Sequence, residues 1–203
     1  AELAAPLEEI RNEVVGEATD VIEGNRDVCR AMECSGGNLI ADAMLARVKD
    51  QGIQVAIANS GGIRASIDAG EITKGEVLTV LPFQNTLSTF EVSGQVLIDA
   101  LENGVSEISE GGGRFPQVAG MTFAVDPAAE VGSRVSDVMI DGAPLDPAAT
   151  YGVVSNNFVR NGGDGYKMFT DAANAYDFGP DLADVVSEFS AANGGAYTPY
   201  TDG

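Results

Sequence analysis

The chain has 203 residues, of which 44% are hydrophobic, a length and composition typical of one large globular domain or two small ones. Eleven basic residues stand against 31 acidic ones, and the net charge of −20 disfavours binding to the phosphate backbone of DNA or RNA. Histidine is absent, which excludes Ser-His-Asp catalysis, Cys-His catalysis and histidine-ligated zinc for this chain. Any chemistry done by the chain alone must use carboxylates, arginines or hydroxyls.

Neither a membrane span nor a signal peptide is indicated by the sequence. No run approaches the ~20 consecutive apolar residues that a membrane helix needs. The start at Ala1 lacks the basic and apolar segments of a signal peptide. We therefore expect a mature protein or a part cut from a longer one, with no membrane span.

Apolar residues at helical spacing predict five helices. The second is followed by Gly52, the third is ended by Pro82, Ser93 caps the fourth, and Pro180 precedes the last. The predicted helices cover 6–17, 38–49, 74–81, 93–108 and 181–191.

Short apolar or alternating runs predict five strands, and Asp141-Gly142 is the strongest hairpin signal in the chain. The predicted strands cover 54–58, 86–92, 117–125, 135–140 and 150–155. There is no internal repeat, no low-complexity linker and no shift of composition that would mark a boundary. Helices interspersed with strands predict an α+β (mixed α/β) fold, a single domain with a mixed β-sheet flanked by helices.

The two cysteines, Cys29 and Cys34, are separated by four residues, which is not the spacing of a redox motif and offers too few ligands for a metal. One interpretation is a pair of buried free thiols. A local disulfide is favoured, because a tight turn in the loop before the second helix can bring the two side chains together. So short a bridge stabilises the chain little and would mainly define the shape of the loop. It would also indicate an oxidising compartment.

Four loops combine glycine and asparagine with charged or aromatic residues, and such loops often carry function. They cover 24–34, 59–64, 81–86 and 155–166. The first three loops also have purely structural interpretations. The arginines of the first could be solvated and paired with surface carboxylates, the second could be an ordinary glycine turn, and the third could hold a core phenylalanine at a helix end. The last loop superficially resembles a calcium-binding loop, but it lacks the ligand spacing and the final glutamate of an EF-hand.

Together the four loops contain what a nucleotide site needs. Two aromatic rings can sandwich a base at roughly 1–3 kcal/mol per stacked face. A carboxylate can accept hydrogen bonds from both ribose hydroxyls, and guanidinium groups suit phosphate. Four of the few cationic residues fall in these loops: Arg26, Arg30, Arg64 and Arg160. In so acidic a chain, their clustering indicates a bound anion.

Four segments in these loops and the following helix closely resemble the C-terminal domain of the 5'-nucleotidase family. They are 29–44, Asn59-Ser-Gly-Gly-Ile-Arg64, Leu81-Pro-Phe83 and the segment 157–166, which reads Asn-Phe-Val-Arg-Asn-Gly-Gly-Asp-Gly-Tyr. The family includes bacterial 5'-nucleotidase/UDP-sugar hydrolases, 2',3'-cyclic-nucleotide phosphodiesterases and animal ecto-5'-nucleotidase. The resemblance covers nearly the whole chain in the family's order and spacing. It departs from the family at Ser35-Gly36, which leaves the start of the second helix open.

The resemblance implies a division of labour between two domains. Family members have an N-terminal metallophosphoesterase domain that holds two divalent metal ions, and a C-terminal domain that binds the nucleoside part of the substrate. Residues 16–203 would be this second domain and 1–15 the end of an interdomain linker helix, with the N-terminal domain absent. The chain itself would bind no cofactor or metal, would contain no catalytic residue and would be inactive alone.

Site residues carry over by motif position. They are Arg26, Arg30, Asn59, Arg64, Phe83, Asn157, Phe158 and Asp164. The two phenylalanines would sandwich the base, the aspartate would hold the ribose hydroxyls, and the arginines would contact ribose and phosphate. Asn59 would precede the Gly-Gly turn in the cleft, and Asn157 would lie near the edge of the base. The cysteine pair matches a disulfide found in some members.

The resemblance thus implies the nucleotide-binding half of a phosphoric ester hydrolase. Its partners would be a nucleoside or nucleotide and the N-terminal domain of the same polypeptide, and it would be periplasmic or extracellular. Two other readings stay open: a stand-alone nucleotide-binding module, and a structural or interaction domain with a vestigial cleft.

Overall fold

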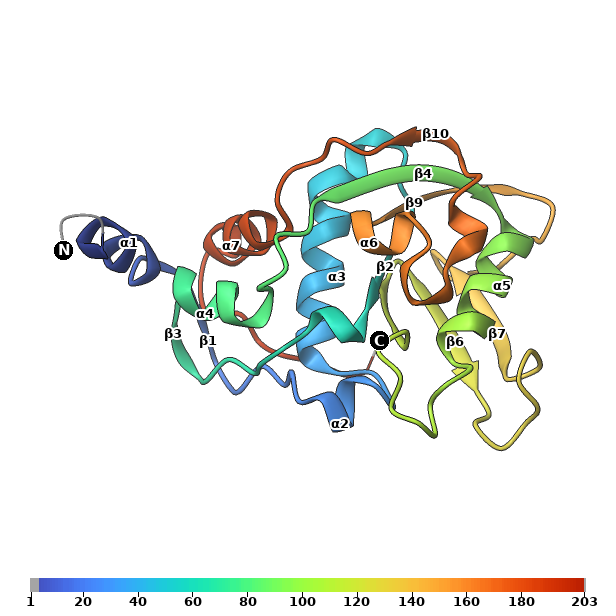
Figure 1. Ribbon diagram of the computed structural model, residues 1–203, viewed down its shortest axis with the longest axis horizontal. Coiled ribbons are helices and arrows are strands. Elements are labelled where there is room, and N and C mark those ends of the chain that lie inside the picture. The colour runs from blue at the N-terminus through green and yellow to red at the C-terminus, as the bar shows by residue number, and fades with distance from the viewer. Residues whose placement is uncertain (1–3, 203) are drawn as a thin grey trace.

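A five-stranded sheet forms the centre of the computed structural model, which describes residues 4–202 (Figure 1). Its strands, in spatial order, are β10 (Ala173–Tyr176), β4 (Leu87–Ser93), β9 (Thr150–Asn156), β2 (Val55–Asn59) and β5 (Pro116–Ala119). β2 and β9 are parallel, and the other neighbours are antiparallel. The sheet is mixed, which confirms the predicted fold class.

Helices cover both faces of this sheet because successive side chains of a strand point to opposite sides. In β2, Ala56 and Ala58 pack into the cluster beneath α3 (Ser35–Val48) and α7 (Leu182–Ala192). Val55 and Ile57 of the same strand pack into a second cluster with α5 (Gly94–Gly104). The molecule therefore has two hydrophobic cores separated by the sheet (Figure 1).

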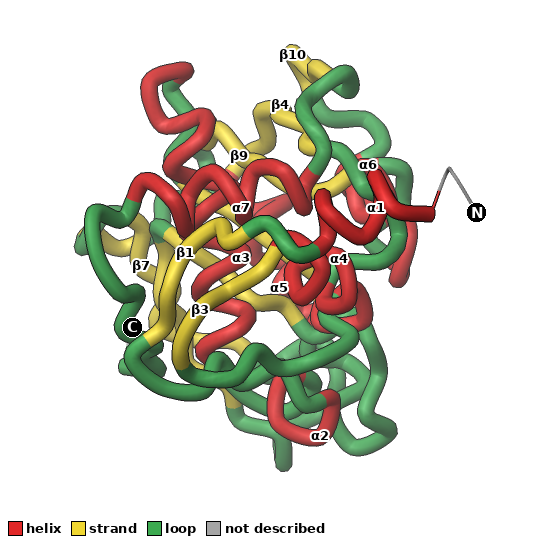
Figure 2. Tube along the Cα trace, turned by 90° about the vertical axis from the view of Figure 1, so that its left-hand side faces the viewer, coloured by secondary structure: helices red, strands yellow, loops and turns green. Residues whose placement is uncertain are grey.

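Two smaller sheets flank these layers. β1 (Val14–Ala18) pairs with β3 (Gly70–Thr73), beside α7, α4 (Lys74–Val80) and α1 (Ala4–Arg11) (Figure 2). On the α5 side, β6 (Met121–Val125), β7 (Val135–Ile140) and β8 (Ala143–Pro144) form the third sheet. Asp141 and Gly142 turn the chain between β7 and β8 with φ values of 50° and 75°, which confirms the hairpin.

Short helices occupy the connections between these elements. They are α2 (Arg26–Cys29), η1 (Lys49–Gln51), η2 (Ser60–Gly62), α6 (Asn157–Arg160), η3 (Gly163–Gly165) and η4 (Lys167–Phe169). Three of the four loops that the sequence singled out contain such a helix, so these loops have defined shapes.

Two predicted elements differ from the structure in kind. The helix expected over 6–17 ends at Arg11, and Val14–Ala18 is a strand instead, since Val14 and the residues 16–18 pair with β3. The single strand expected over 117–125 divides at Gly120, whose φ is +76° and where a Cβ would lie 2.0 Å from the carbonyl oxygen of Gln54. Its two halves, β5 and β6, belong to different sheets.

Other predicted boundaries shift by a few residues. The helix expected from Asn38 begins at Ser35, capped by the sulfur of Cys34, and the one expected to reach residue 108 ends at Gly104. Of the proposed linker helix over 1–15, residues 1–3 lie outside the described part of the chain, α1 covers 4–11, and β1 begins at Val14. The domain boundary itself remains a prediction.

Candidate functional site

The loop 24–34 is shaped by α2 and by a disulfide. Asn25 caps α2, its Oδ1 accepting a hydrogen bond from the amide of Asp27 (2.9 Å). Cys29 and Cys34, both fully buried, are bonded with 5.1 Å between their Cα atoms, so the favoured alternative to free thiols is confirmed. This loop carries Arg26 and Arg30.

Three arginines gather around one hollow. Arg26, Arg30 and Arg64 line a cavity of about 340 Å³ between loop 24–34 and the segment after η2. Within the part of the chain that the structure describes, no ion pair joins any of the three to a carboxylate. Three uncompensated guanidinium groups make this hollow suited to an anion.

The electrostatic surroundings of Arg30 show how close these groups lie. Burial lowers the pKa of its guanidinium first, and the positive charges of Arg26 and Arg64 lower it further. The charge of Asp164 acts in the opposite direction. Arg30 donates a hydrogen bond from Nη1 to the carbonyl of Gly111 (3.2 Å). The sequence-predicted arginines and aspartate therefore share one electrostatic environment.

The carboxylate of Asp164 is oriented by two asparagines in series. Asn59 donates from Nδ2 to Asp164 Oδ2 (2.8 Å), and Asn59 Oδ1 accepts from Nδ2 of Asn156 (2.9 Å). Asp164 has the left-handed backbone conformation, with φ 53° and ψ 30°. A non-glycine residue held in this way is over-determined by its surroundings, as is common in binding sites. One carboxylate oxygen of Asp164 is engaged by Asn59, and the place of Asn59 in a binding cleft remains a prediction.

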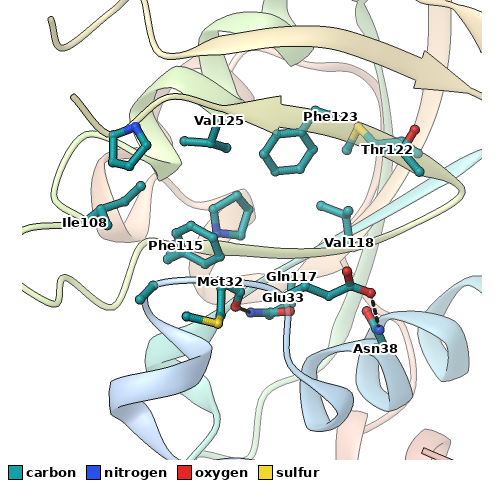
Figure 3. Close-up of a pocket in the computed structure, with 14 residues that line it drawn as sticks. Met32, Glu33, Asn38, Ile108, Phe115, Gln117, Val118, Thr122, Phe123 and Val125 are labelled. Atoms are coloured by element: carbon teal, nitrogen blue, oxygen red, sulfur yellow. Dashed lines mark hydrogen bonds between the residues drawn. The ribbon is translucent and has the colours of Figure 1, made fainter. Parts of the chain in front are cut away.

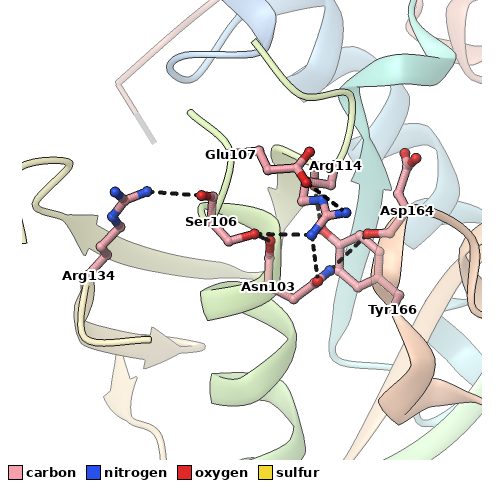
Figure 4. Close-up of polar contacts among 7 residues, drawn as sticks. All are labelled: Asn103, Ser106, Glu107, Arg114, Arg134, Asp164 and Tyr166. Atoms are coloured by element: carbon pink, nitrogen blue, oxygen red, sulfur yellow. Dashed lines mark hydrogen bonds and ion pairs between the residues drawn. The ribbon is translucent and has the colours of Figure 1, made fainter. Parts of the chain in front are cut away.

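A polar network supports the backbone of Asp164 from below (Figure 4). Asn103 donates from Nδ2 to the Asp164 carbonyl (3.0 Å) and accepts from Arg114 Nη1 (3.2 Å). Arg114 also pairs with Glu107 (3.1 Å), and the buried hydroxyl of Tyr166 donates to the Arg114 carbonyl (2.6 Å). In Figure 4 the Asp164 carboxylate points away from this network.

The two phenylalanines of the expected base sandwich are exposed, with 56% of Phe83 and 46% of Phe158 accessible to solvent. Arg64 lies over the Phe83 ring, with 5.7 Å from Cζ to the ring centroid. The Phe158 ring packs on Gly163, where a Cβ would lie 2.6 Å from two of its carbon atoms. One ring thus adjoins the arginine hollow, and the other adjoins Asp164.

Asn157 joins the loops that carry these rings. Its backbone amide donates to the carbonyl of Thr86 (2.9 Å), and its Oδ1 accepts from the amide of Thr86 (3.0 Å). The third and fourth loops are thereby hydrogen-bonded to each other. Its expected role at the edge of the base remains a prediction.

Arg160 does not belong to the arginine cluster, and the interpretation that counted it there is wrong. It is 9% exposed and donates from Nη1 to the carbonyls of Phe169 (2.8 Å) and Thr170 (3.2 Å). Its Nε pairs with Asp177 at 3.3 Å. Nothing in the sequence indicated this structural role, because the partners of Arg160 lie 9, 10 and 17 residues further along the chain.

Sequence reasoning missed the side chains that position the site: Asn103, Asn156 and Gln117. Asn156 stands beside the chosen Asn157, but only the register of β9 shows which of the two faces Asn59. Gln117 is a buried amide in an otherwise apolar strand, and that contrast was the available signal.

A second cavity, of about 300 Å³, lies between β5, β6 and the disulfide loop (Figure 3). Its walls are mainly apolar and include Met32, Phe115, Val118 and Phe123, while Gln117 reaches from β5 to the Met32 carbonyl. None of the sequence-predicted site residues lines it.

Residues 4–202 contain neither a membrane-spanning helix nor a cluster of metal ligands. No helix there is long and apolar enough to cross a membrane. No group of three or more Cys, Asp or Glu side chains in that range is arranged to hold a metal ion.

Comparisons with known proteins agree with this geometry. The model of the family described as 5'-nucleotidase, C-terminal domain matches residues 14–171. A trifunctional nucleotide phosphoesterase protein of Bacillus subtilis is 42% identical over 203 residues, covering 97% of this chain and 14% of that protein. The human 5'-nucleotidase is 33% identical over 201 residues, covering 90% of this chain and 35% of that protein.

Solved structures extend the likeness to the fold. The crystal structure of a 5'-nucleotidase precursor from Thermus thermophilus matches with a TM-score of 0.90 and 42% identity, covering 94% of this chain and 38% of that one. The chain thus spans less than two fifths of the length of these relatives. On the family match and on these identities, this chain belongs to the 5'-nucleotidase C-terminal domain family.

Proposed function

We propose that this domain binds the nucleoside and phosphate parts of a nucleotide for a two-domain 5'-nucleotidase-type hydrolase. The observation that carries the proposal is the arginine hollow. In a chain of net charge −20, Arg26, Arg30 and Arg64 line one cavity, and none of them forms an ion pair with a described carboxylate. A bound anion is the partner that this arrangement lacks.

The surrounding side chains supply recognition of the rest of a nucleotide. Phe83 and Phe158 present faces on which a base stacks, at roughly 1–3 kcal/mol for each ring. Asp164, held by Asn59, has a free carboxylate oxygen for the ribose hydroxyls. The base, sugar and phosphate would then follow one another across the four loops.

The catalytic step belongs to a domain outside this chain. The family resemblance assigns two divalent metal ions to an N-terminal metallophosphoesterase domain, where they would polarise the phosphate and activate water. The described residues of this chain do not fit such a pair of ions, and no step through them is derived. The chain would present the phosphate to that domain, with residues 1–15 ending the connection and a rotation between domains opening the site.

Calorimetry with adenosine and AMP tests the binding. We expect both to bind, and we expect Phe158→Ala to weaken both about tenfold through loss of one stacked face. Asp164→Asn should weaken the binding of adenosine and leave the binding of 2',3'-dideoxyadenosine unchanged, because that analogue lacks the ribose hydroxyls. Absence of binding by the unmodified chain would favour the structural or interaction domain instead.

A phosphate-release assay tests the division of labour. The purified chain, given AMP with manganese or zinc, should release no phosphate above a protein-free control. Turnover would refute the proposal that catalysis resides elsewhere. Joining the chain to a relative's N-terminal domain and recovering AMP hydrolysis would argue against a stand-alone binding module.

We further propose a periplasmic or extracellular location, which the Cys29–Cys34 disulfide supports because such bonds persist in oxidising compartments. Trapping of thiols in intact cells, followed by mass spectrometry, should find this pair oxidised. A reduced pair in the native host would contradict it.

A further inference from the structure

Gln117 is the most deeply buried amide near the arginine hollow. It lies in β5, at the edge of the central sheet, with 1% of its surface exposed. Its Oε1 accepts from the amide of Cys34 (3.2 Å), and its Nε2 donates to the carbonyls of Cys29 (2.9 Å) and Met32 (2.9 Å). One side chain thus holds three backbone groups that lie more than 80 residues away in the sequence. Figure 3 shows its contact with Met32.

The three groups belong to the same loop that the disulfide closes. Cys29 and Cys34 are its ends, and Arg30 is the next residue after Cys29. The Cys29 carbonyl also accepts from Ser60 Oγ (2.5 Å), and that hydroxyl contacts the Phe115 carbonyl as well (2.6 Å). The backbone leading into Arg30 is therefore tied to the ends of β2 and β5, the strands beside the cleft.

Neighbouring elements leave room for this amide. Gly37, in the first turn of α3, approaches Gln117 so closely that a Cβ there would lie 2.3 Å from Gln117 Cγ. Any larger residue at position 37 would displace the amide from the loop. The packing is thus built around the glutamine at this position.

Arg30 itself has few anchors of its own. Its Nη1 donates to Gly111, and its buried Nε has no hydrogen-bond partner among the described residues. The direction of its side chain consequently depends on the backbone that carries it. That backbone is held by the disulfide, by the Gln117 amide and by the Ser60 hydroxyl at the Cys29 carbonyl.

We propose that Gln117 is a positioning residue that aims Arg30 at the anionic part of the ligand. The inference rests on the proposed nucleotide binding and adds a residue that touches no ligand. The disulfide alone joins the ends of the loop, while Gln117 joins the loop to the sheet that carries Asn59. Without Gln117 the loop keeps its disulfide and the Ser60 bond at Cys29, and it loses the side-chain bonds that fix Met32 and Cys34 against β5.

The test compares Gln117→Met with Gln54→Met. Both changes replace an amide by an apolar chain of similar length. Among the described residues, Gln54 Oε1 accepts a hydrogen bond only from the amide of Gly152 (2.8 Å), away from the arginine loop. We expect Gln117→Met to weaken the binding of AMP about tenfold, which corresponds to the loss of one charge-assisted hydrogen bond. The affinity for adenosine should be unchanged. Gln54→Met should leave both affinities unchanged. Thermal unfolding of each variant checks that the domain remains folded.

A second readout needs no nucleotide. Phenylglyoxal modifies accessible arginines, and peptide mapping compares the rates at Arg30 and Arg64 in one sample. In Gln117→Met the rate at Arg30 should rise relative to that at Arg64. If Gln117→Met does not fold, Gln117→Glu serves, since it keeps the acceptor for Cys34 and loses both donated bonds.

The outcomes separate the two proposals. An unchanged Arg30 rate, or equal weakening of AMP and adenosine, overturns the positioning role of Gln117. Failure of the unmodified chain to bind either ligand refutes the proposed function, while the modification rates still decide whether Gln117 places Arg30. A fall in the preference for AMP together with a faster Arg30 reaction supports the inference.

Discussion

Asn59→Asp is the substitution for which the structure gives the clearest expectation. Asn59 is 5% exposed at the end of β2, with Nδ2 2.8 Å from Asp164 Oδ2 and Oδ1 2.9 Å from Asn156 Nδ2. An aspartate has nearly the same shape and keeps the acceptor for Asn156. It replaces the donor facing Asp164 by a second carboxylate oxygen.

The cost has two parts. A hydrogen bond to a charged group contributes about 1.5–3 kcal/mol, and that contribution is lost. Two carboxylates whose charges lie about 4 Å apart repel by roughly 4 kcal/mol at an effective dielectric constant of 20. The side chain of Asp164 is partly exposed, and solvent screening reduces the second figure. We expect the free energy of unfolding at about pH 7.5 to fall by ~3 kcal/mol, with proton uptake by the pair limiting the loss.

The pH dependence identifies the cause. The folded variant holds a proton on the pair at higher pH than a lone carboxylate does in the unfolded chain, about 3.9. A raised folded-state pKa gives stability that is complete below the unfolded value and is lost as the pH rises through the folded value. The deficit against the unmodified protein should therefore shrink between about pH 7.5 and about pH 4.5.

Urea unfolding followed by circular dichroism measures the deficit at both pH values. The matched control is the double variant Asn59→Asp/Asp164→Asn, in which one side chain of the contact again donates and the other accepts. It should recover most of the stability at neutral pH. An equal deficit at both pH values, with no recovery in the double variant, would refute this account of the contact.

Three further changes have definite expected outcomes. Gly163→Ala should lower the stability by about 1–3 kcal/mol and weaken the binding of adenosine, because the new Cβ would lie 2.6 Å from the Phe158 ring. The control Gly195→Ala places its Cβ where nothing lies within 4 Å and should cost little stability, and thermal unfolding compares the two variants. Replacing both cysteines, five positions apart, by serine should lower the free energy of unfolding by about 2 kcal/mol, measured in urea; no change would contradict the loop-closure estimate. Burial raises the pKa of Asp42, and the Tyr200 hydroxyl that donates to it (2.5 Å) opposes this, so Tyr200→Phe should raise that pKa further. The loss of stability caused by Tyr200→Phe should then grow as the pH rises from acid to neutral. A loss independent of pH would exclude the coupling between Tyr200 and the ionisation of Asp42.

Elements whose signals are local were predictable from the sequence. The Ser93 cap, the alternating Leu87–Ser93 strand and the Asp141-Gly142 turn depend on neighbouring residues alone, and the structure has all three. The segment Val14–Ala18 was misjudged because its apolar spacing also fits a helix, and only pairing with a strand more than 50 residues away decides between them.

The residues proposed to face the ligand could be named from the sequence, and the side chains that support them could not. Phe83 and Asp164 lie in motifs that are recognisable along the chain. Gln117 and Asn156 act through partners 88 and 97 residues away, and a single sequence contains no local trace of such contacts. The supports of a site depend on how distant strands align, which is a property of the folded chain.

The order of strands in the central sheet has a consequence for how the domain forms. β9 lies between β2 and β4 and pairs in parallel with β2 about a hundred residues earlier, with Ser155 Oγ bonded to the Ile57 carbonyl across 98 positions. Contacts of such long sequence separation slow folding, because a large loop must close before they contribute. A nascent chain that ends before residue 150 lacks the strand joining β2 to β4, and it lacks Asn156 and Asp164 as well. During synthesis, the proposed nucleotide binding should therefore appear only after residues 150–164 have left the ribosome.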